Sequence, residues 1–378
     1  MEYKKLGDIA TYINGYAFKP EQRGSEGLPI IRIQDLTGNA YDLGYYNGDY
    51  PKKIELNDGD VLISWSASLG VYLWNRGKAL LNQHIFKVVF DKVEIDKFYF
   101  MYAVEYNLDK MSLKTHGATM KHITKKDFDN VVIPYPDLDY QKDISYRLTS
   151  LKRIIEKYQE QLDLLDELIK ARFVEMFGNP VIGTEKWPIH IVDNVAEAVD
   201  PQPSHRTPPI DPDGIPYVSI KDCDLKSGNI DFEGARKVSK NVLEEHLKRY
   251  ELHDGDFIIG KIGTVGNPIF VPQRRNYALS ANVVLVQPNK SVVRPYFLKY
   301  SFESEFVERQ FNEAKNSTSQ AAFGIQKVRL IRVMNPSLNV QDEFEKFAIE
   351  IDKSRSRIQK SLEASQELFD SLMQEYFG

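Results

Sequence analysis

The sequence is poor in cysteine and contains no long apolar run. Its 378 residues include one cysteine, Cys223, so neither a disulfide framework nor a zinc cluster built from cysteines is possible. No stretch of about 18 apolar residues occurs, and a membrane-spanning helix is therefore not expected. The first residues, MEYKKLGDIATYING, contain no apolar stretch that resembles a signal peptide. We expect a cytoplasmic protein in a reducing compartment, with no membrane partner.

An excess of basic residues is also missing. The chain has 49 lysines and arginines against 54 aspartates and glutamates, which gives a net charge of −5. A protein that binds DNA alone usually shows a basic surface, because it must neutralise phosphates. We therefore expect partner chains to supply much of the phosphate neutralisation if this chain contacts DNA. With 42% hydrophobic residues, the length predicts two or three domains with real cores.

Catalytic motifs are absent as well. There is no phosphate-binding loop of the Gly-x-x-x-x-Gly-Lys-Ser/Thr type. The segment Asn267-Pro268-Ile269-Phe270 half-matches the motif with which adenine methyltransferases hold a flipped base, but it lacks the second proline. We interpret it as a turn. The seven histidines show no spacing typical of metal ligands. We therefore expect no catalytic residue, no metal site and no bound cofactor in this chain.

The chain contains an internal duplication. Segments of the first half recur in the same order in the second half, separated by about half the chain. The matching pairs are Pro29–Asp35 and Pro216–Asp222, Leu56–Ile63 and Leu252–Ile259, Leu81–Val88 and Leu279–Val286, Pro136 with Gln141 and Pro336 with Gln341, and Phe177-Gly178 and Phe377-Gly378. One short turn could recur by chance, but five matches in register indicate a duplicated domain.

Each half begins with a globular segment. Residues 1–137 and about 181–336 contain short apolar runs separated by Gly, Pro, Asn and Asp, a pattern typical of strands and turns with a few helices. In Asp58-Gly59-Asp60 and Asp254-Gly255-Asp256, the glycine can adopt a positive φ and an aspartate can close the turn. We favour this turn interpretation over a role of these acids as metal ligands.

Each half ends in a long helix. From Tyr140 to Phe177 there is no proline or glycine, and apolar residues recur in steps of three and four, which predicts a coiled-coil seam. The first seam consists of Ile144, Leu148, Leu151, Ile155, Tyr158, Leu162, Leu165, Ile169, Phe173 and Met176. The second consists of Phe344, Phe347, Ile351, Ile358, Leu362, Phe369, Leu372 and Tyr376, interrupted by Arg355 and Ser365. We expect Asp139 or Asn339 to cap the helix starts.

A helix with so narrow an apolar stripe is not stable alone, and the simplest partner is the other copy. We favour antiparallel packing over parallel packing, which would crowd both globular domains at one end. The alternative is that each helix packs on its own globular domain. The sequence thus predicts an α+β fold with two tandem α/β globular domains, two long antiparallel coiled-coil helices and pseudo-two-fold symmetry. The predicted domains are residues 1–138, 139–178, 179–337 and 338–378.

Two loop regions in each half differ most between the copies. One follows the Asp-Gly-Asp strand, at 64–70 and 260–266, and the other precedes the long helix, at 114–122 and 315–320. Their small, polar and basic residues suit contact with DNA bases and phosphates, although ordinary solvated loops remain an alternative. The candidate DNA-contacting residues are Trp65, Ser66, Ser68, His84, Thr115, His116, Thr119, Lys121, His122, Lys261, Thr264, Arg274, Arg275, Asn282, Ser317, Thr318 and Gln320.

Taken together, these features resemble the specificity (S) subunits of Type I restriction–modification systems. The resemblance covers essentially the whole chain. It rests on the duplicated Leu-x-x-Gly-Asp strand, Leu81-Asn82-Gln83-His84, Ile133-Pro134-Tyr135-Pro136 followed by Gln141, and the helix ends Met176-Phe177-Gly178 and Tyr376-Phe377-Gly378. It implies that each globular domain is a target recognition domain that binds one half of a split site in double-stranded DNA.

The resemblance also implies a role for the helices and a set of partners. The helices would fix the gap between the half-sites and dock two methyltransferase (M) subunits, with a seam that includes Leu148, Leu151, Ile155, Leu162, Leu165, Ile351, Ile358, Leu362 and Leu372. The M subunits would carry S-adenosylmethionine and methylate adenine. The resemblance allows two kinds of complex, one with up to two restriction (R) subunits, which would use ATP and Mg, and one without R subunits. The alternatives are a self-contained restriction or modification enzyme and a structural coiled-coil protein without a DNA function.

Overall fold

The computed structural model describes residues 2–38, 44–114, 124–184, 186–202, 206–261, 266–274, 276–316 and 324–378, without the side chains of 112–114 and 315–316. The chain forms two compact units. Unit 1 comprises Met1–Lys157 and Glu363–Gly378, and unit 2 comprises Tyr158–Leu362. The border between the units falls inside both long helices, whereas the boundaries predicted from the sequence lie at the helix ends. Each helix therefore contributes to both units.

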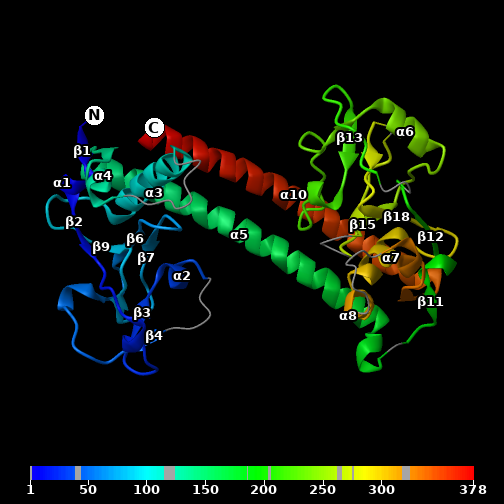
Figure 1. Cartoon of the computed structure of the whole chain (residues 1–378), viewed down its shortest axis with the longest axis horizontal. Helices are drawn as coiled ribbons and strands as arrows, with labels where there is room; N and C mark the ends of the chain where they lie inside the picture. The colour runs from blue at the N-terminus through cyan, green and yellow to red at the C-terminus, as the bar shows by residue number, and fades with distance from the viewer. Residues whose placement is uncertain are drawn as a thin grey trace. The chain divides into compact units, whose positions relative to one another are not determined.

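Unit 1 contains two four-stranded sheets (Figure 1). The first is antiparallel, in the order β2 (Thr11–Asn14), β9 (Ile85–Val89), β6 (Val61–Ser64) and β7 (Gly70–Leu73). The second is mixed, with β3 and β8 parallel, in the order β4 (Gly44–Tyr46), β3 (Leu28–Ile31), β8 (Ala79–Leu81) and β5 (Glu55–Leu56). A separate antiparallel pair joins β1 (Tyr3–Lys5) and β10 (Val132–Pro134). The helices are α1 (Leu6–Ile9), α2 (Ile33–Leu36), α3 (Lys97–Lys114) and α4 (Lys125–Asp129), with short 3₁₀ turns at Pro20–Gln22 and Lys52–Ile54.

Unit 2 repeats this plan. Its antiparallel sheet has the order β12 (Ala196–Val199), β18 (Val283–Pro288), β15 (Phe257–Gly260) and β16 (Ile269–Phe270). Its mixed sheet, with β13 and β17 parallel, has the order β14 (Lys237–Val238), β13 (Ile215–Val218) and β17 (Ala278–Leu279). The separate pair joins β11 (Ile189–Ile191) and β19 (Arg332–Met334). The helices are α6 (Lys240–Leu247), α7 (Pro295–Phe302), α8 (Glu305–Asn316) and α9 (Ile325–Arg329), with 3₁₀ turns at Pro180–Ile182, Val192–Asn194 and Ile220–Asp222.

The repeated Asp-Gly-Asp segments form the same tight turn in both units. Gly59 and Gly255 have φ values of 89° and 87°, in the region that favours glycine. The Asp60 carboxylate accepts a hydrogen bond from the backbone N–H of Asn57 at 2.8 Å. The Asp256 carboxylate accepts one from the backbone N–H of His253, also at 2.8 Å. Each turn leads directly into a buried strand, β6 or β15. The turn interpretation is therefore confirmed.

Two helices of 40 residues follow the globular domains, α5 (Leu138–Phe177) and α10 (Leu338–Phe377). The backbone N–H of Tyr140 donates to Asp137 Oδ1 at 2.9 Å, so the carboxylate that caps α5 belongs to Asp137. The predicted caps at Asp139 and Asn339 are wrong, because both helices begin one residue earlier and these residues lie in the first turn. Among the described helices, none has the length and apolar character needed to cross a bilayer.

The two helices pack antiparallel within each unit. In unit 1, the core contains Leu148 from the start of α5 and Phe377 from the end of α10. In unit 2, Arg172 near the end of α5 pairs with Glu343 near the start of α10, with Nη2 and Oε1 3.1 Å apart. The antiparallel prediction is confirmed. The alternative, in which each helix packs only on its own globular domain, is wrong, because Phe377 lies beside Tyr99 of the first domain, with ring centroids 5.2 Å apart.

The apolar seams contribute to the main core of each unit. In unit 1, the sheet of β2, β9 and β6 and helix α3 enclose seam residues that include Ile144, Leu148, Phe369 and Leu372. In unit 2, the equivalent core includes Ile169, Phe173, Phe344 and Ile351. The other seam residues named from the sequence are buried or half-buried, namely Leu151, Ile155, Tyr158, Leu162, Leu165, Met176, Phe347, Ile358, Leu362 and Tyr376. The seam therefore faces inward along both helices, as predicted.

Candidate nucleic-acid interface

The loop that follows β6 is shaped by its own polar groups. The Ser64 hydroxyl lies within hydrogen-bond distance of the carbonyl oxygens of Ser66 and Ser68, at 3.3 and 2.5 Å. Ala67, between them, has a φ of 58°, which a residue with a Cβ rarely adopts. Ser66 is half-buried and Ser68 is exposed. The two predicted serines thus lie on a tight, strained loop that reaches solvent.

The fold brings Trp65 of this loop against His84, in the turn between β8 and β9. The Trp65 ring stacks on Phe86, with centroids 5.5 Å apart, and meets the His84 ring edge-on at 5.0 Å. The backbone N–H of Trp65 donates to the carbonyl oxygen of His84 at 3.4 Å. Two residues that were predicted separately therefore form one half-buried aromatic cluster.

Backbone strain marks the same place. Among the described residues, Ala67 and His84 are the two non-glycine residues with a positive φ. Strained backbone is kept where the surrounding structure enforces it, and it is concentrated at binding sites. His84 Nδ1 and the Oδ1 atom of Asn82, a buried residue two positions earlier, have no hydrogen-bond partner among the described residues. This surface is the candidate contact region of unit 1, and Asn82 is a member that the sequence-based selection missed.

The equivalent loops of unit 2 carry different side chains on the same backbone. The N–H of Lys261 donates to the carbonyl oxygen of Asn282 at 2.8 Å, as Trp65 does to His84. Asn282 is exposed. Lys261 was expected to offer a positive charge, but the residue is 6% exposed and its Nζ lies 2.8 Å from Asp200 Oδ1. That expectation is wrong, because a buried ammonium is kept only with a partner, and Asp200 supplies it.

Arg274 lies at the edge of a cavity in unit 2. It is exposed, and its guanidinium lies over the ring of Phe232 at 5.3 Å. The cavity has a volume of about 260 Å³ and is lined by Leu243, His246, Leu247, Tyr250, Glu251, Leu252, Gln273, Arg274 and Tyr277. Burial lowers the pKa of His246 to about 4, so its ring is neutral near pH 7. Arg274 is therefore the exposed cation that lines this cavity, and its contact with DNA stays a prediction.

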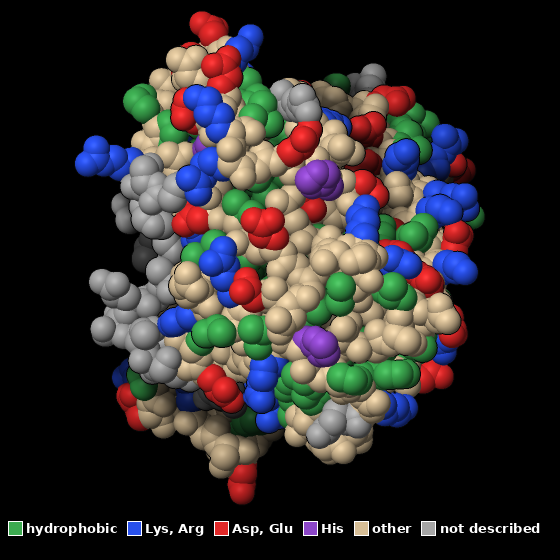
Figure 2. Space-filling model, turned by 90° about the vertical axis from the view of Figure 1, so that its right-hand side faces the viewer, with side chains coloured by type: hydrophobic (Ala, Val, Ile, Leu, Met, Phe, Trp, Pro, Cys, Tyr) green, Lys and Arg blue, Asp and Glu red, His purple; other side chains and the backbone are tan. Residues whose placement is uncertain are grey.

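The other predicted DNA-contacting residues lie outside the described residues. They are Thr115, His116, Thr119, Lys121, His122, Thr264, Arg275, Ser317, Thr318 and Gln320. On the face drawn in Figure 2, basic and acidic side chains are interspersed. Within the described ranges, no three His, Cys, Asp or Glu side chains gather in a way that could hold a metal ion.

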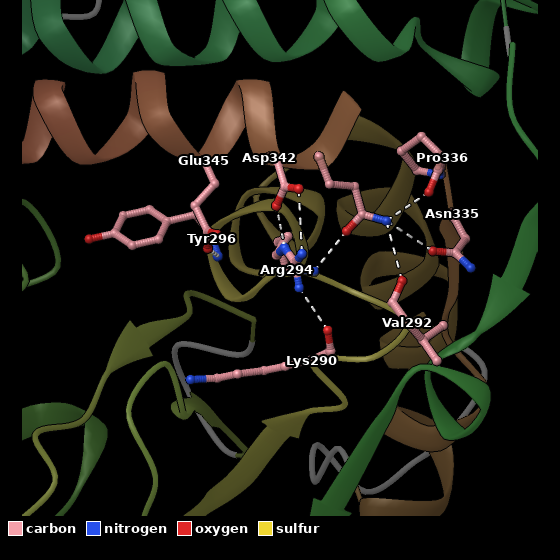
Figure 3. A network of polar contacts seen from close by, with 9 residues as sticks. Lys290, Val292, Arg294, Tyr296, Asn335, Pro336, Asp342 and Glu345 are labelled. Carbon is pink, nitrogen blue, oxygen red and sulfur yellow. Dashed lines mark hydrogen bonds and ion pairs between the residues drawn. The ribbon is translucent and has the colours of Figure 1, made fainter. Parts of the chain in front are cut away.

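A buried glutamine ties α10 to the second globular domain, and Figure 3 labels its partners Arg294, Asn335 and Pro336. Gln341 is fully buried, and its Oε1 accepts the backbone N–H of Arg294 at 2.7 Å. Its Nε2 donates to the Pro336 carbonyl at 2.8 Å and approaches Asn335 Oδ1 at 3.2 Å. Arg294 in turn forms an ion pair with Asp342 of α10. These contacts join the end of β19, the start of α7 and the first turn of α10.

The same glutamine occurs in unit 1. Gln141 is fully buried, accepts the backbone N–H of Asp96 at 3.0 Å and donates to the Pro136 carbonyl at 2.8 Å. The repeated Pro-x-x-x-x-Gln spacing in the sequence is thus a structural joint that sets the exit direction of each long helix. The sequence contained this signal, but its role required the partners across the fold.

A duplicated α/β domain carried on two long antiparallel helices, with unlike loops at equivalent positions, defines a class of two-domain recognition proteins. The family model of the Type I restriction modification DNA specificity domain matches residues 1–165 and again 213–365. These matches cover most of the chain, and the chain belongs to this family. The resemblance stated from the sequence is therefore confirmed.

Known proteins that are similar to this chain include specificity subunits of Type I restriction enzymes. The specificity subunit of the Type I restriction enzyme EcoBI from Escherichia coli is 23% identical over 366 residues, which cover 89% of this chain and 76% of that protein. A Type I restriction–modification S subunit from M. genitalium has a TM-score of 0.61 at 12% identity, over 100% of this chain and 96% of that one. A further structure, which concerns complex assembly and conformational transition of the type I R-M system, gives a TM-score of 0.52 at 13% identity, over 99% and 97%. The structural matches show a shared fold.

Proposed function

We propose that this chain is the DNA-specificity subunit of a Type I restriction–modification complex. Each globular domain binds one half of a bipartite, asymmetric site in double-stranded DNA. The observation that carries the proposal is the pair of equivalent loop sites, in which the same backbone hydrogen bond, from Trp65 to His84 and from Lys261 to Asn282, holds loops of unlike sequence. One scaffold with two sets of reading groups is what two different half-sites require.

The long helices have two roles in this proposal. They set the gap between the half-sites, and they dock two M subunits, which direct adenine methylation. R subunits add restriction where they are present. Both helices contribute residues to both units. The net charge of −5 supports a complex in which the partner subunits, and not this chain, neutralise most of the DNA phosphates.

We propose further that the chain is not itself catalytic and binds no cofactor. S-adenosylmethionine then belongs to the M subunits, and ATP with Mg to the R subunits. The phosphate-binding loop is absent from the sequence and the methyltransferase motif is incomplete, which supports this assignment. A role on cellular DNA places the chain in the cytoplasm.

The test is co-expression with a cognate adenine methyltransferase, followed by sequencing of the methylated positions. The expected result is one bipartite motif with an unspecified gap, lost when this chain is deleted. Exchange of residues 1–137 for another such domain should change one half of the motif only. Methylation that is independent of this chain would overturn the proposal, as would methyl transfer or DNA cleavage by the purified chain alone.

A point variant sharpens this test. Trp65→Ala removes the largest side chain of the unit 1 cluster and should weaken binding by about 10- to 100-fold, the usual cost of a lost contact to a base edge. The loss of affinity should depend on the base sequence of one half-site and not on that of the other. The matched control is Phe98→Ala, because Phe98 is an exposed aromatic residue of the same unit, on α3. An equal loss for both variants would remove Trp65 from the interface.

A further inference from the structure

The seam of α10 is interrupted by one arginine. Ile351, Ile358 and Leu362 continue the apolar pattern on either side of Arg355. The Arg355 side chain is 18% exposed, so its guanidinium lies largely inside the helix interface of unit 2. A charged group at such a position costs desolvation free energy and needs partners that compensate for it.

The Arg355 guanidinium has one ion-pair partner on its own helix, Asp352, whose Oδ1 lies 4.0 Å from Nε, and two partners on other segments. Nη2 forms an ion pair with Asp166 of α5. Nη1 donates to the backbone carbonyl of Lys226 at 3.3 Å, in the second globular domain. The Lys226 ammonium also lies 3.5 Å from Asp163 of α5, although both side chains are exposed and this pair contributes little. A single guanidinium thus joins α10, α5 and the recognition domain of unit 2.

The domain side of this contact is a compact turn. A β-bridge between Cys223 and Ile230 closes the segment. Within it, Asp224 Oδ1 accepts the backbone N–H of Lys226 at 2.9 Å, and Ser227 donates to the same carboxylate at 2.6 Å. These bonds fix the position of the Lys226 carbonyl. The contact with Arg355 therefore links a defined point of the domain to the helices.

The contact breaks the symmetry of the duplication. Each residue of α5 corresponds to the residue 200 positions later in α10, as Phe177 and Phe377 show. The counterpart of Arg355 is Ile155, which is buried and apolar, and the counterpart of Asp166 is Gln366. These counterparts cannot form an ion pair. The seam therefore carries its charged pair at one of the two equivalent positions.

We propose that Arg355 is a positioning residue that fixes the angle of the second recognition domain on the helix pair and thereby restricts the DNA gap length that the subunit accepts. This inference rests on the proposed function. A buried ion pair adds little net stability compared with apolar residues of similar size, but it specifies register and orientation. The two roles can be separated by experiment for that reason.

The experiment uses the full chain in complex with its M subunits. The substrates are duplexes in which the gap between the half-sites is the natural length, one base pair shorter or one base pair longer. Arg355→Met fills the seam with an unbranched apolar side chain and removes both contacts, and Arg355→Met with Asp166→Leu also removes the unpaired carboxylate. The control is Arg172→Met, which breaks the Arg172–Glu343 pair between the same two helices.

The expected result separates specificity from stability. The double variant should keep a melting temperature within about 3 °C of wild type. Arg355→Met alone leaves the Asp166 carboxylate without its partner and should melt at a lower temperature. The preference of both variants for the natural gap should fall about fivefold or more, as for other losses of coupling between sites. Arg355→Lys, which keeps the charge, should recover part of that preference, and Arg172→Met should keep all of it.

Two outcomes overturn the inference. In one, the Arg355 variants keep the wild-type gap preference. In the other, methylation falls equally on all three duplexes together with the melting temperature, which is the signature of a merely structural role. The wild-type complex is measured beside the variants. If it methylates no bipartite site, the proposed function itself fails, which distinguishes that case from failure of the Arg355 inference.

Discussion

Gln341 offers the sharpest test of how the fold is held together. It lies at the joint between β19, α7 and α10 and is fully buried. We consider its replacement by leucine, which has a similar volume but neither donates nor accepts hydrogen bonds. The change leaves the Arg294 N–H and the Pro336 carbonyl without the bonds that they now make at 2.7 and 2.8 Å.

The expected cost follows from the burial of these two groups. An unsatisfied buried polar group costs about 1–3 kcal/mol. The bond to Pro336 is buried and should be near the upper end, whereas the bond to Arg294 is partly exposed and should be near the lower end. Gln341→Leu should therefore destabilise unit 2 by about 2–4 kcal/mol. Gln141→Leu should cost unit 1 less, because both of its bonds are partly exposed.

The assay is urea unfolding of the full chain, with hydrogen exchange read by peptide to separate the two units. The control is Gln161→Leu, at an exposed position of α5, which should change stability by less than about 0.5 kcal/mol. If Gln341→Leu costs no more than Gln161→Leu, the buried glutamine does not hold the joint and the reasoning is refuted. A loss that appears only in unit 1 would refute it equally.

Further predictions concern pH and backbone conformation. Burial lowers the pKa of His246 to about 4, against 6.5 when free, so stability should fall as pH drops from 6.5 to 4. In the His246→Gln variant, the free energy of unfolding should fall less steeply with decreasing pH, by up to about 1.4 kcal/mol per pH unit. Equal slopes of the free energy of unfolding against pH for the variant and the wild type would contradict this. Gly59→Ala should cost about 1–2 kcal/mol through its positive φ. In the same urea unfolding assay, Gly255→Ala should cost more, because a Cβ there would lie 2.5 Å from Pro295 Cγ, whereas at Gly59 the nearest atom is Lys97 Nζ at 3.5 Å.

Several features of this protein follow from local sequence alone. The steps of three and four from Ile144 to Met176 predict the buried face of α5, because the helical period is a local property. The Asp-Gly-Asp turns are equally local, since Gly59 and Gly255 need a positive φ that few other residues tolerate. The duplication is likewise readable from sequence order. Fold class and family could therefore be predicted.

The candidate site was predictable only in part. Trp65 and His84 stand out in sequence as residues of two unlike loops, but their contact depends on the pairing of β6 with β9. Lys261 was misjudged because nothing near it in sequence indicates the carboxylate of Asp200 that neutralises it. Burial and partnership arise between residues far apart in the chain, and no local pattern records them.

The tertiary structure alone decided how the two copies are joined. The sequence supplied two similar helices, but the place of Phe377 in the core of unit 1 depends on packing against Tyr99. In sequence, Arg355 is an interruption of a seam. In the folded chain it is a link between two helices and a recognition domain, because Asp166 and the Lys226 carbonyl meet it there. Periodicity determines which face of a helix is buried, and the three-dimensional packing determines what that face meets.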